Sequence, residues 1–477
     1  MNDAGLSERT IPVAAAASPP PASGTGTPSS ATYPRPAVAW LSVGVLFLLY
    51  WLSMVDRLIM SFLIGPIRRD LGISDFEISL LQGAAFGACY ALCGLPLGWL
   101  VDRLNRRRLI FWGVMAWSLA TTCCGLARNF GQLFLSRVGV GAGEATLNPA
   151  SYSILADSFP PHRLTMALTV YAMAGVVGGG MAFLLGGLVV EAVTAAAAVA
   201  LPVVGSVRPW QLAFLVIGAP GALLALLAFA FPEPQRQRRG RPPHRFGGLE
   251  ALRQMFRQLS GQWRFYTCHH TAFTLMIAAS TGLTLWSPAY LARSFGWRPA
   301  EIGLALGLTM MIAGLIGGPL GGWLIDRRFA RGVHDAHFRW FLLASICHVP
   351  LGLVAFAAGD ARVFLAMLFC MQVFGATIMG VAAASLQIVT PGELRGRVSA
   401  FYLFVNVLLG IGLGPSVVGA FTDFLFHDDA MLGWSLALTI CIFCSLAAIV
   451  FRLGCRPMRD AVAATGITPL SRATPAN

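Results

Sequence analysis

The 477-residue sequence contains no lysine, and it carries little charge of any kind. All 34 of its basic residues are arginine, and charged residues make up only 12% of the chain, whereas a soluble protein usually has about 25%. A chain without lysine cannot form a Walker A loop, whose lysine binds nucleotide phosphates, nor a Schiff base on a lysine. These absences argue against an ordinary soluble protein and against an ATP-driven pump.

The sequence also gives no sign of a metal, a cofactor or a nucleic-acid partner. The net charge is +13, but the arginines lie in short loops between apolar runs, where membrane topology explains them. Most of the ten cysteines lie within the apolar runs and are expected to behave as small hydrophobic residues. Cys441 and Cys444 form a CxxC motif inside one such run, where we expect neither redox chemistry nor metal binding.

Apolar residues, by contrast, make up 56% of the chain and recur in runs long enough to cross a bilayer as helices. This pattern predicts an all-α membrane protein with twelve transmembrane helices. The predicted spans are 38–64, 78–101, 109–126, 133–157, 165–192, 211–231, 265–292, 302–325, 338–358, 363–390, 399–425 and 431–453.

The polar stretches between the spans divide the chain into five parts. Residues 1–36 and 456–477 are predicted to be disordered cytoplasmic tails. Residues 1–36 are rich in Pro, Ala, Ser, Thr and Gly and hold no apolar run. Residues 37–232 and 265–455 each hold six spans, and 233–264 is a basic cytoplasmic linker with an amphipathic stretch near 249–259.

The distribution of arginine predicts the orientation. With the N-terminus in the cytoplasm, the five cytoplasmic loops hold 19 arginines, counting Arg339 at the start of the ninth span, and the opposite loops hold 7. Because positive residues are retained on the cytoplasmic side, both termini are predicted to be cytoplasmic, in the cell inner membrane.

The two halves share a repeated motif. The stretch from Leu95 to Arg103 resembles that from Gly318 to Arg327, and each ends the second helix of its half and opens a basic loop. Two similar six-helix halves are typical of secondary transporters, in which one half rocks against the other around a central site.

Four charged residues lie well inside the predicted spans: Asp56 and Arg57 in the first, Arg137 and Glu144 in the fourth. A charge at the bilayer centre costs about 2.5–3.5 kcal/mol on insertion scales, so each should face a cavity or a partner. The seven-residue spacing of Arg137 and Glu144 puts both on one helix face. If the two spans are neighbours, the four charges can form a buried network that binds substrate and proton. The alternative is that they only hold two helices together.

Several motifs resemble those of a known family. The stretch from Gly98 to Arg108 (GWLVDRLNRRR) looks like the loop 2–3 signature of the major facilitator superfamily. Its asparagine at 105, Val55-Asp56-Arg57, and the RVGVGAGEA stretch from Arg137 to Ala145 are similar to the Spinster branch. The resemblance implies the two-half major facilitator fold and a carrier activity; animal members of the branch move sphingosine 1-phosphate or lysophospholipids.

The resemblance also implies roles for individual residues. Asp56, Arg57, Arg137 and Glu144 would be the polar cavity residues. The loop signature would act as a gate, with Asp102 capping the N-terminus of the eleventh span near Ser399, and Arg106 or Arg107 pairing with Asp157. The full set of expected gating residues is Gly98, Asp102, Arg103, Arg106, Arg107, Asp157, Asp326 and Arg327.

We therefore expect a secondary active transporter that moves a small amphipathic or organic anion by alternating access, coupled to protons. The expected partners are a small-molecule or lipid-like substrate, protons and membrane lipid, and the chain is expected to be a monomer. A carrier of a small organic acid, such as a sugar acid or an aromatic carboxylate, remains an alternative. A multi-pass membrane enzyme is disfavoured because no His/Asp or metal-type cluster is present, and a transporter-like receptor because no soluble domain is present.

Overall fold

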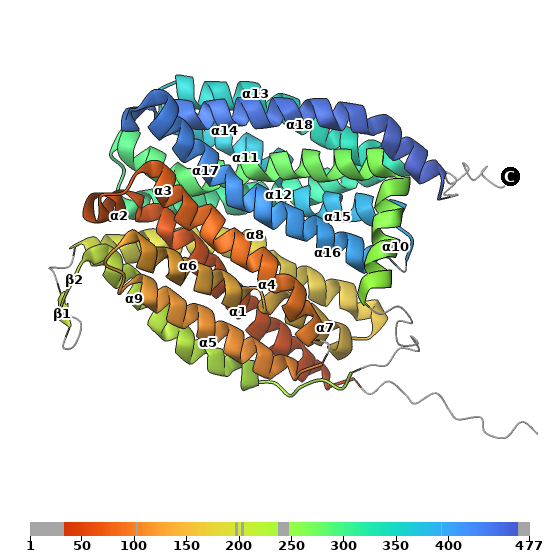
Figure 1. Ribbon diagram of the computed structural model, residues 1–477, viewed down its shortest axis with the longest axis horizontal. Coiled ribbons are helices and arrows are strands. Elements are labelled where there is room, and N and C mark those ends of the chain that lie inside the picture. Colours follow the sequence, from red (N-terminus) through yellow and green to blue (C-terminus); the bar gives the residue numbers. More distant parts are fainter. Residues whose placement is uncertain are drawn as a thin grey trace, which may run out of the picture.

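A computed structural model describes residues 33–465 apart from 102, 196–198, 202–204, 237–247 and 393. The protein consists of two helical bundles that lie side by side, joined by a linker that carries one short helix (Figure 1). The predicted tail 1–36 falls almost wholly outside the described residues, because the described chain begins at Tyr33 and the first helix at Pro36.

The N-terminal half holds the elements before the linker. They are α1 (Pro36–Phe62), α2 (Ile64–Leu71), α3 (Asp75–Ser79), η1 (Leu80–Ala84), α4 (Ala85–Val101), α5 (Arg106–Cys124), α6 (Phe130–Glu144), α7 (Leu147–Ser158), α8 (Pro161–Ala195), β1 (Val199–Leu201), β2 (Gly205–Val207), α9 (Pro209–Leu224) and η2 (Ala225–Phe229). The strands β1 and β2 form a small antiparallel hairpin that the sequence did not predict.

The linker and the C-terminal half follow. The linker helix α10 (Gly248–Gly261) falls on the predicted amphipathic stretch. The C-terminal half holds α11 (Trp263–Phe295), α12 (Pro299–Ala330), α13 (Ala336–Ala357), α14 (Ala361–Gly375), α15 (Ile378–Val389), α16 (Arg395–Val405), η3 (Asn406–Ile411), α17 (Gly412–Ala420), η4 (Phe421–Phe426), η5 (Asp429–Met431) and α18 (Leu432–Ala463).

Ten helices among the described residues are long and apolar enough to cross a membrane. The other two predicted spans are also helical. The third corresponds to α5, which begins with three arginines, and the fourth is divided between α6 and α7 and carries Arg137 and Glu144. Their charged residues make these two spans less apolar than the other ten. The structure is therefore consistent with twelve crossings.

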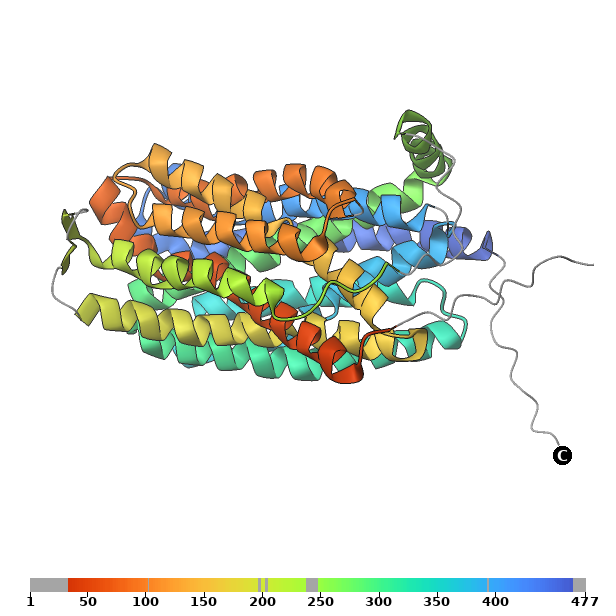
Figure 2. The same cartoon turned by 90° about the horizontal axis from the view of Figure 1, so that it is seen from below.

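The start of α1, the end of α18 and helix α10 all lie at one end of the molecule, which we call the terminal end (Figure 2). The hairpin β1–β2 and helix α2 lie at the opposite end, which we call the far end (Figure 1). Two chain ends on the same side are what an even number of crossings requires.

The last helix is longer than predicted. The expected tail 456–477 begins as a continuation of α18, which extends to Ala463. Met458 and Val462 are fully buried there, and Arg459 donates a 2.7 Å hydrogen bond to Asp335. Polar composition predicted a disordered segment, but apolar residues one turn apart give this segment a face to bury. Residues 466–477 lie outside the described part of the chain.

The two halves meet closely at the far end. A Cβ added to Gly83 in η1 would lie 2.4 Å from the carbonyl oxygen of Gly412, and one added to Gly187 in α8 would lie 2.4 Å from that of Pro299. By contrast, a Cβ on Gly94 or Gly322, nearer the terminal end of α4 and α12, would meet nothing within 4 Å. The backbones thus touch at the far end, whereas these two glycines of the terminal end have open space beside them.

Candidate substrate site

The structure pairs two of the four charges that the sequence placed inside the spans. Arg57 Nε donates a hydrogen bond of 2.5 Å to Glu144 Oε2. The Glu144 side chain is fully buried, while the Arg57 side chain remains 22% exposed. The guanidinium also lies over the rings of Phe86 and Tyr90, with its carbon 4.6 and 5.1 Å from their centroids. Helices α1, α4 and α6 together therefore position this ion pair.

Arg137 and Asp56 lie beside this pair but do not form a second ion pair. Buried Arg137 donates to two backbone carbonyl oxygens, those of Leu81 at 3.2 Å and Asp56 at 3.3 Å. The buried Asp56 carboxylate lies beside Thr121 and Trp117 but makes no hydrogen bond of good geometry with a described residue. The predicted network thus contains one direct ion pair, and Asp56 is a buried carboxyl group that would be costly to ionise.

A cluster of tyrosines, which the sequence analysis missed, adjoins the ion pair. The chain has eight tyrosines, and four of them lie together. Tyr50 stacks on Tyr171 with centroids 5.3 Å apart, and Tyr152 packs edge-on against Tyr171 at 5.5 Å. Asn148 joins the cluster, since it donates to the hydroxyl of Tyr90 at 3.2 Å and accepts from that of Tyr171 at 2.6 Å. The only signal in the sequence was the scarcity of tyrosine.

The expected gating residues at the terminal end form contacts within the N-terminal half. Arg106 is fully buried and pairs with Asp157 in α7 and with Glu233 after η2, the latter at 2.6 Å. It also donates to the carbonyl oxygens of Ser153 and Pro234. Of the two arginines considered for Asp157, it is therefore Arg106 that makes the ion pair, and this contact holds three segments of one half together.

Arg107 has other partners. It donates to the carbonyl oxygens of Ala228 at 3.1 Å and Phe229 at 2.9 Å. These contacts close the last turn of the sixth span against the start of α5, again within one half.

The repeated motif has the same local geometry in both halves. Arg103 lies over the ring of Trp99 at 3.8 Å, and Arg327 lies over that of Trp323 at 5.0 Å. Asp326 is exposed at the end of α12, and a Cβ on Gly98 would meet nothing within 4 Å. Asp102 lies outside the described residues, and so does the cap that it was expected to form. The eleventh span begins at Arg395, before the expected Ser399.

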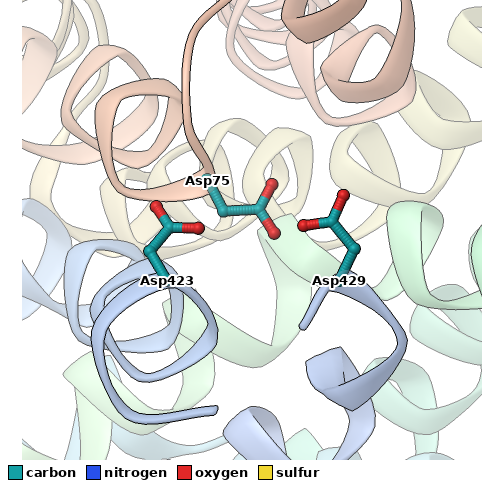
Figure 3. Close-up of side chains that lie close together, drawn as sticks. All are labelled: Asp75, Asp423 and Asp429. Atoms are coloured by element: carbon teal, nitrogen blue, oxygen red, sulfur yellow. The ribbon is translucent and has the colours of Figure 1, made fainter. Parts of the chain in front are cut away.

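The far end holds a second group of charges, which the sequence analysis did not single out. Buried Asp75 of α3 accepts two hydrogen bonds of 2.7 Å from Arg293 of α11, and Arg68 lies 3.0 Å from it. Arg68 also donates to Asp429 at 2.6 Å, and the backbone N–H of Phe76 donates to Asp423 at 2.6 Å. Figure 3 shows the three carboxylates converging from the two halves.

These charges close the far end. Among the described residues, the ion pairs that join the two halves are Arg293–Asp75, Arg68–Asp429 and Arg298–Glu191, and all three lie there. A cleft of about 610 Å³ opens at the pairs of Arg68 and Arg293, lined by Gly65, Arg68, Arg69, Gly72, Ile73, Arg293, Asp429 and Ala430. The cleft is cationic on balance, since three arginines and one aspartate line it.

The family model of the Major Facilitator Superfamily matches residues 46–415. The chain belongs to this superfamily. An "MFS-type efflux pump" of Mycolicibacterium smegmatis is 28% identical over 90% of this chain and 95% of its own length. "Protein spinster homolog 1" of Homo sapiens is 25% identical over 81% of this chain and 74% of its own length. The similarity to Spinster proteins that the motifs indicated is thus confirmed.

A solved structure supports the fold assignment for this superfamily member. The crystal structure of a bacterial homolog of the human lysosomal transporter Spinster, in an inward-facing and unoccupied conformation, has a TM-score of 0.75, with 23% identity. The alignment covers 90% of this chain and 99% of that one. The two-half transporter fold predicted from the sequence is therefore confirmed, and the family and fold are those of a transporter rather than an enzyme.

Proposed function

We propose that this transporter moves a small amphipathic or organic anion across the cell inner membrane by alternating access, coupled to protons. The observation that carries the proposal is the ion pair between Arg57 and Glu144, which is buried among apolar helices while the arginine stays partly exposed. Among the described residues, Glu144 is the one hydrogen-bond acceptor for Arg57, and it accepts only the hydrogen bond from Nε. Both Nη groups are left to bind a carboxylate or phosphate in the forked geometry that suits arginine.

The charge balance of the site links the anion to the proton. Two arginines and two ionised carboxylates give a neutral set, and protonation of either Asp56 or Glu144 leaves a net positive charge. A positive site attracts an anion, so proton and anion bind with positive coupling. Anion affinity should then rise as the pH falls from about 8 to about 6.

From the closed far end we infer which state of the transport cycle the structure represents. With both termini in the cytoplasm, the ion pairs at the far end seal the outer side, and the structure is inward-facing. The close glycine contacts at Gly83 and Gly187 and the open space at Gly94 and Gly322 support this assignment. In the outward-facing state the loop after α4, with Gly98, Asp102, Arg103 and their counterparts Asp326 and Arg327, would meet the other half. The Arg106–Asp157 pair would hold α5, which follows that loop, rigidly against α7.

Replacing Glu144 tests the coupling. Glu144→Gln keeps the shape of the side chain and removes the titratable group, so transport of an anion should lose its dependence on the pH gradient while the protein remains folded. The substrate is first chosen by a thermal-shift screen of lysolipids, bile-acid-like amphiphiles, aromatic acids and sugar acids. Uptake into proteoliposomes is then compared with and without a pH gradient. Glu250→Gln, on the linker helix outside the spans, is the matched control. Unchanged proton dependence in Glu144→Gln would contradict the proposal.

A further inference from the structure

The tyrosine cluster lies on the side of the N-terminal half that faces the other half. Its members come from four helices, with Tyr50 on α1, Tyr90 on α4, Tyr152 on α7 and Tyr171 on α8. Of these, α1 contacts α11, α4 contacts α16 and η3, and α8 contacts α12, all in the C-terminal half. The outer helices α5 and α9, which pack on each other, contribute no tyrosine. The cluster therefore borders the interface around which the halves rock.

The rings are held in fixed orientations, and Tyr50, Tyr90 and Tyr152 keep exposed surface. Asn148 bridges the hydroxyls of Tyr90 and Tyr171, and Tyr171 is fully buried between the rings of Tyr50 and Tyr152. Tyr152 is nevertheless 47% exposed, although it lies within the fourth span, on α7. A pre-organised site of this kind binds a ring without the entropy cost of ordering its own side chains.

The cluster adjoins the anion-binding group directly. The Arg57 guanidinium lies over Tyr90. Tyr50 lies close enough to interact electrostatically with both Arg57 and Glu144. A ligand whose carboxylate binds the Nη groups of Arg57 would thus place its adjoining atoms among tyrosine faces. Aromatic pairs stabilise each other beyond the area that they bury, whereas a flexible alkyl chain gains only the burial.

We propose that Tyr50, Tyr90, Tyr152 and Tyr171 form an aromatic subsite beside Arg57, and that the substrate is a carboxylate carried on an aromatic ring. This inference rests on the proposed function, since Arg57 supplies the contact for the carboxylate. It chooses between the substrate classes that the sequence left open, because neither a sugar acid nor a lysolipid chain presents a planar face to these rings.

The test compares two probes that share one carboxylate and the same number of carbon atoms: 2-naphthoate, which is aromatic, and undecanoate, which is not. Binding to the purified full-length protein is measured by calorimetry. We expect wild-type protein to bind 2-naphthoate about two- to tenfold more tightly than undecanoate. Tyr90→Leu and Tyr152→Leu should each bring that ratio towards one, while Tyr152→Phe, which keeps the ring, should preserve it. Trp112→Leu removes an exposed ring of the same half outside the cluster and is the control.

The outcomes separate the subsite from the anion contact. Equal affinity for the two probes in the wild type, no binding of 2-naphthoate, or an unchanged ratio in both leucine variants would overturn the aromatic subsite. Arg57→Lys should weaken both probes and leave their ratio unchanged, because an ammonium group cannot make the forked contact. If Arg57→Lys binds both probes like the wild type, the anion contact of the proposed function fails, while the ratio still decides the subsite.

Discussion

At the scale of single residues, the arginines inside this protein have different roles, which depend on their partners and their exposure. Arg57 has one carboxylate partner and an exposed edge, which is the arrangement of a ligand-binding group. Arg106 has no exposed surface and binds Asp157, Glu233 and two carbonyl oxygens. A fully satisfied arginine of the second kind contributes to stability rather than to binding.

Arg106→Ala should therefore lower the stability of the N-terminal half. The substitution leaves Asp157 and Glu233 without their common partner. The loss should be about 2 kcal/mol, less than the roughly 3–5 kcal/mol for a fully buried pair, because those side chains are 16% and 23% exposed. The melting temperature of the purified protein measures the effect, with exposed Arg108→Ala as control. Equal melting temperatures for the two variants would show that the Arg106 contacts are dispensable.

The residue scale also shows how far the sequence alone could lead. The intramembrane charges at Arg57 and Glu144 were found because their cost in lipid marks them. Their pairing, with Arg137 turned to backbone oxygens instead, depends on side-chain direction and helix rotation, which spacing does not determine. The tyrosines were missed because a tyrosine in a span is equally consistent with packing. Asp75 and Arg293 were missed because charges at helix ends are ordinary.

At the scale of elements, apolar run length predicted the spans well, and the departures occur where polar residues enter. The fourth span is divided after Glu144, and α18 continues past the predicted end because Met458 and Val462 are buried. Small residues decide how the spans cross. Helices α8 and α12 touch through Gly187, whose Cβ would lie 2.4 Å from the carbonyl oxygen of Pro299 and 3.0 Å from Gly303 Cα.

Gly187→Ala should force these two helices apart at the far end. Overpacking of this kind costs about 1–3 kcal/mol, which exceeds the roughly 0.5–1 kcal/mol that alanine gains over glycine in a helix. The matched control is Gly322→Ala in α12, where the added methyl group meets nothing within 4 Å. Spin labels in place of the exposed Leu188 and Leu304 report the separation of α8 and α12. A separation that is the same in both alanine variants would argue against a tight crossing at Gly187.

At the scale of the whole molecule, a transporter of this fold must close one end as it opens the other. The far end is closed here by charges from both halves, with Asp75 of the N-terminal half at their centre (Figure 3). Arg293 binds Asp75 through two hydrogen bonds, and Arg68 connects Asp75 to Asp429. A single carboxylate thus bears much of the polar contact between the halves, so the balance between the two states should depend on it.

Asp75→Asn should shift the population towards the state that is open at the far end. The amide removes the charge that faces Arg293 and Arg68, two cations that are each only 19% exposed in the closed state. Removing one partner of a largely desolvated ion pair destabilises the closed state by several kcal/mol, about 3–5 at full burial. The open state is not destabilised in this way, because opening exposes both arginines to water. Because about 1.4 kcal/mol changes an equilibrium tenfold, even part of this effect makes the open state measurable.

Spin labels at Arg69 and Ala430, on opposite sides of the cleft, should show a longer distance in the variant. Glu301→Gln, an exposed capping residue at the same end, should leave the distance as in the wild type. An unchanged distance in Asp75→Asn would mean that the glycine contacts between the helices, and not the ion pairs, hold the far end closed.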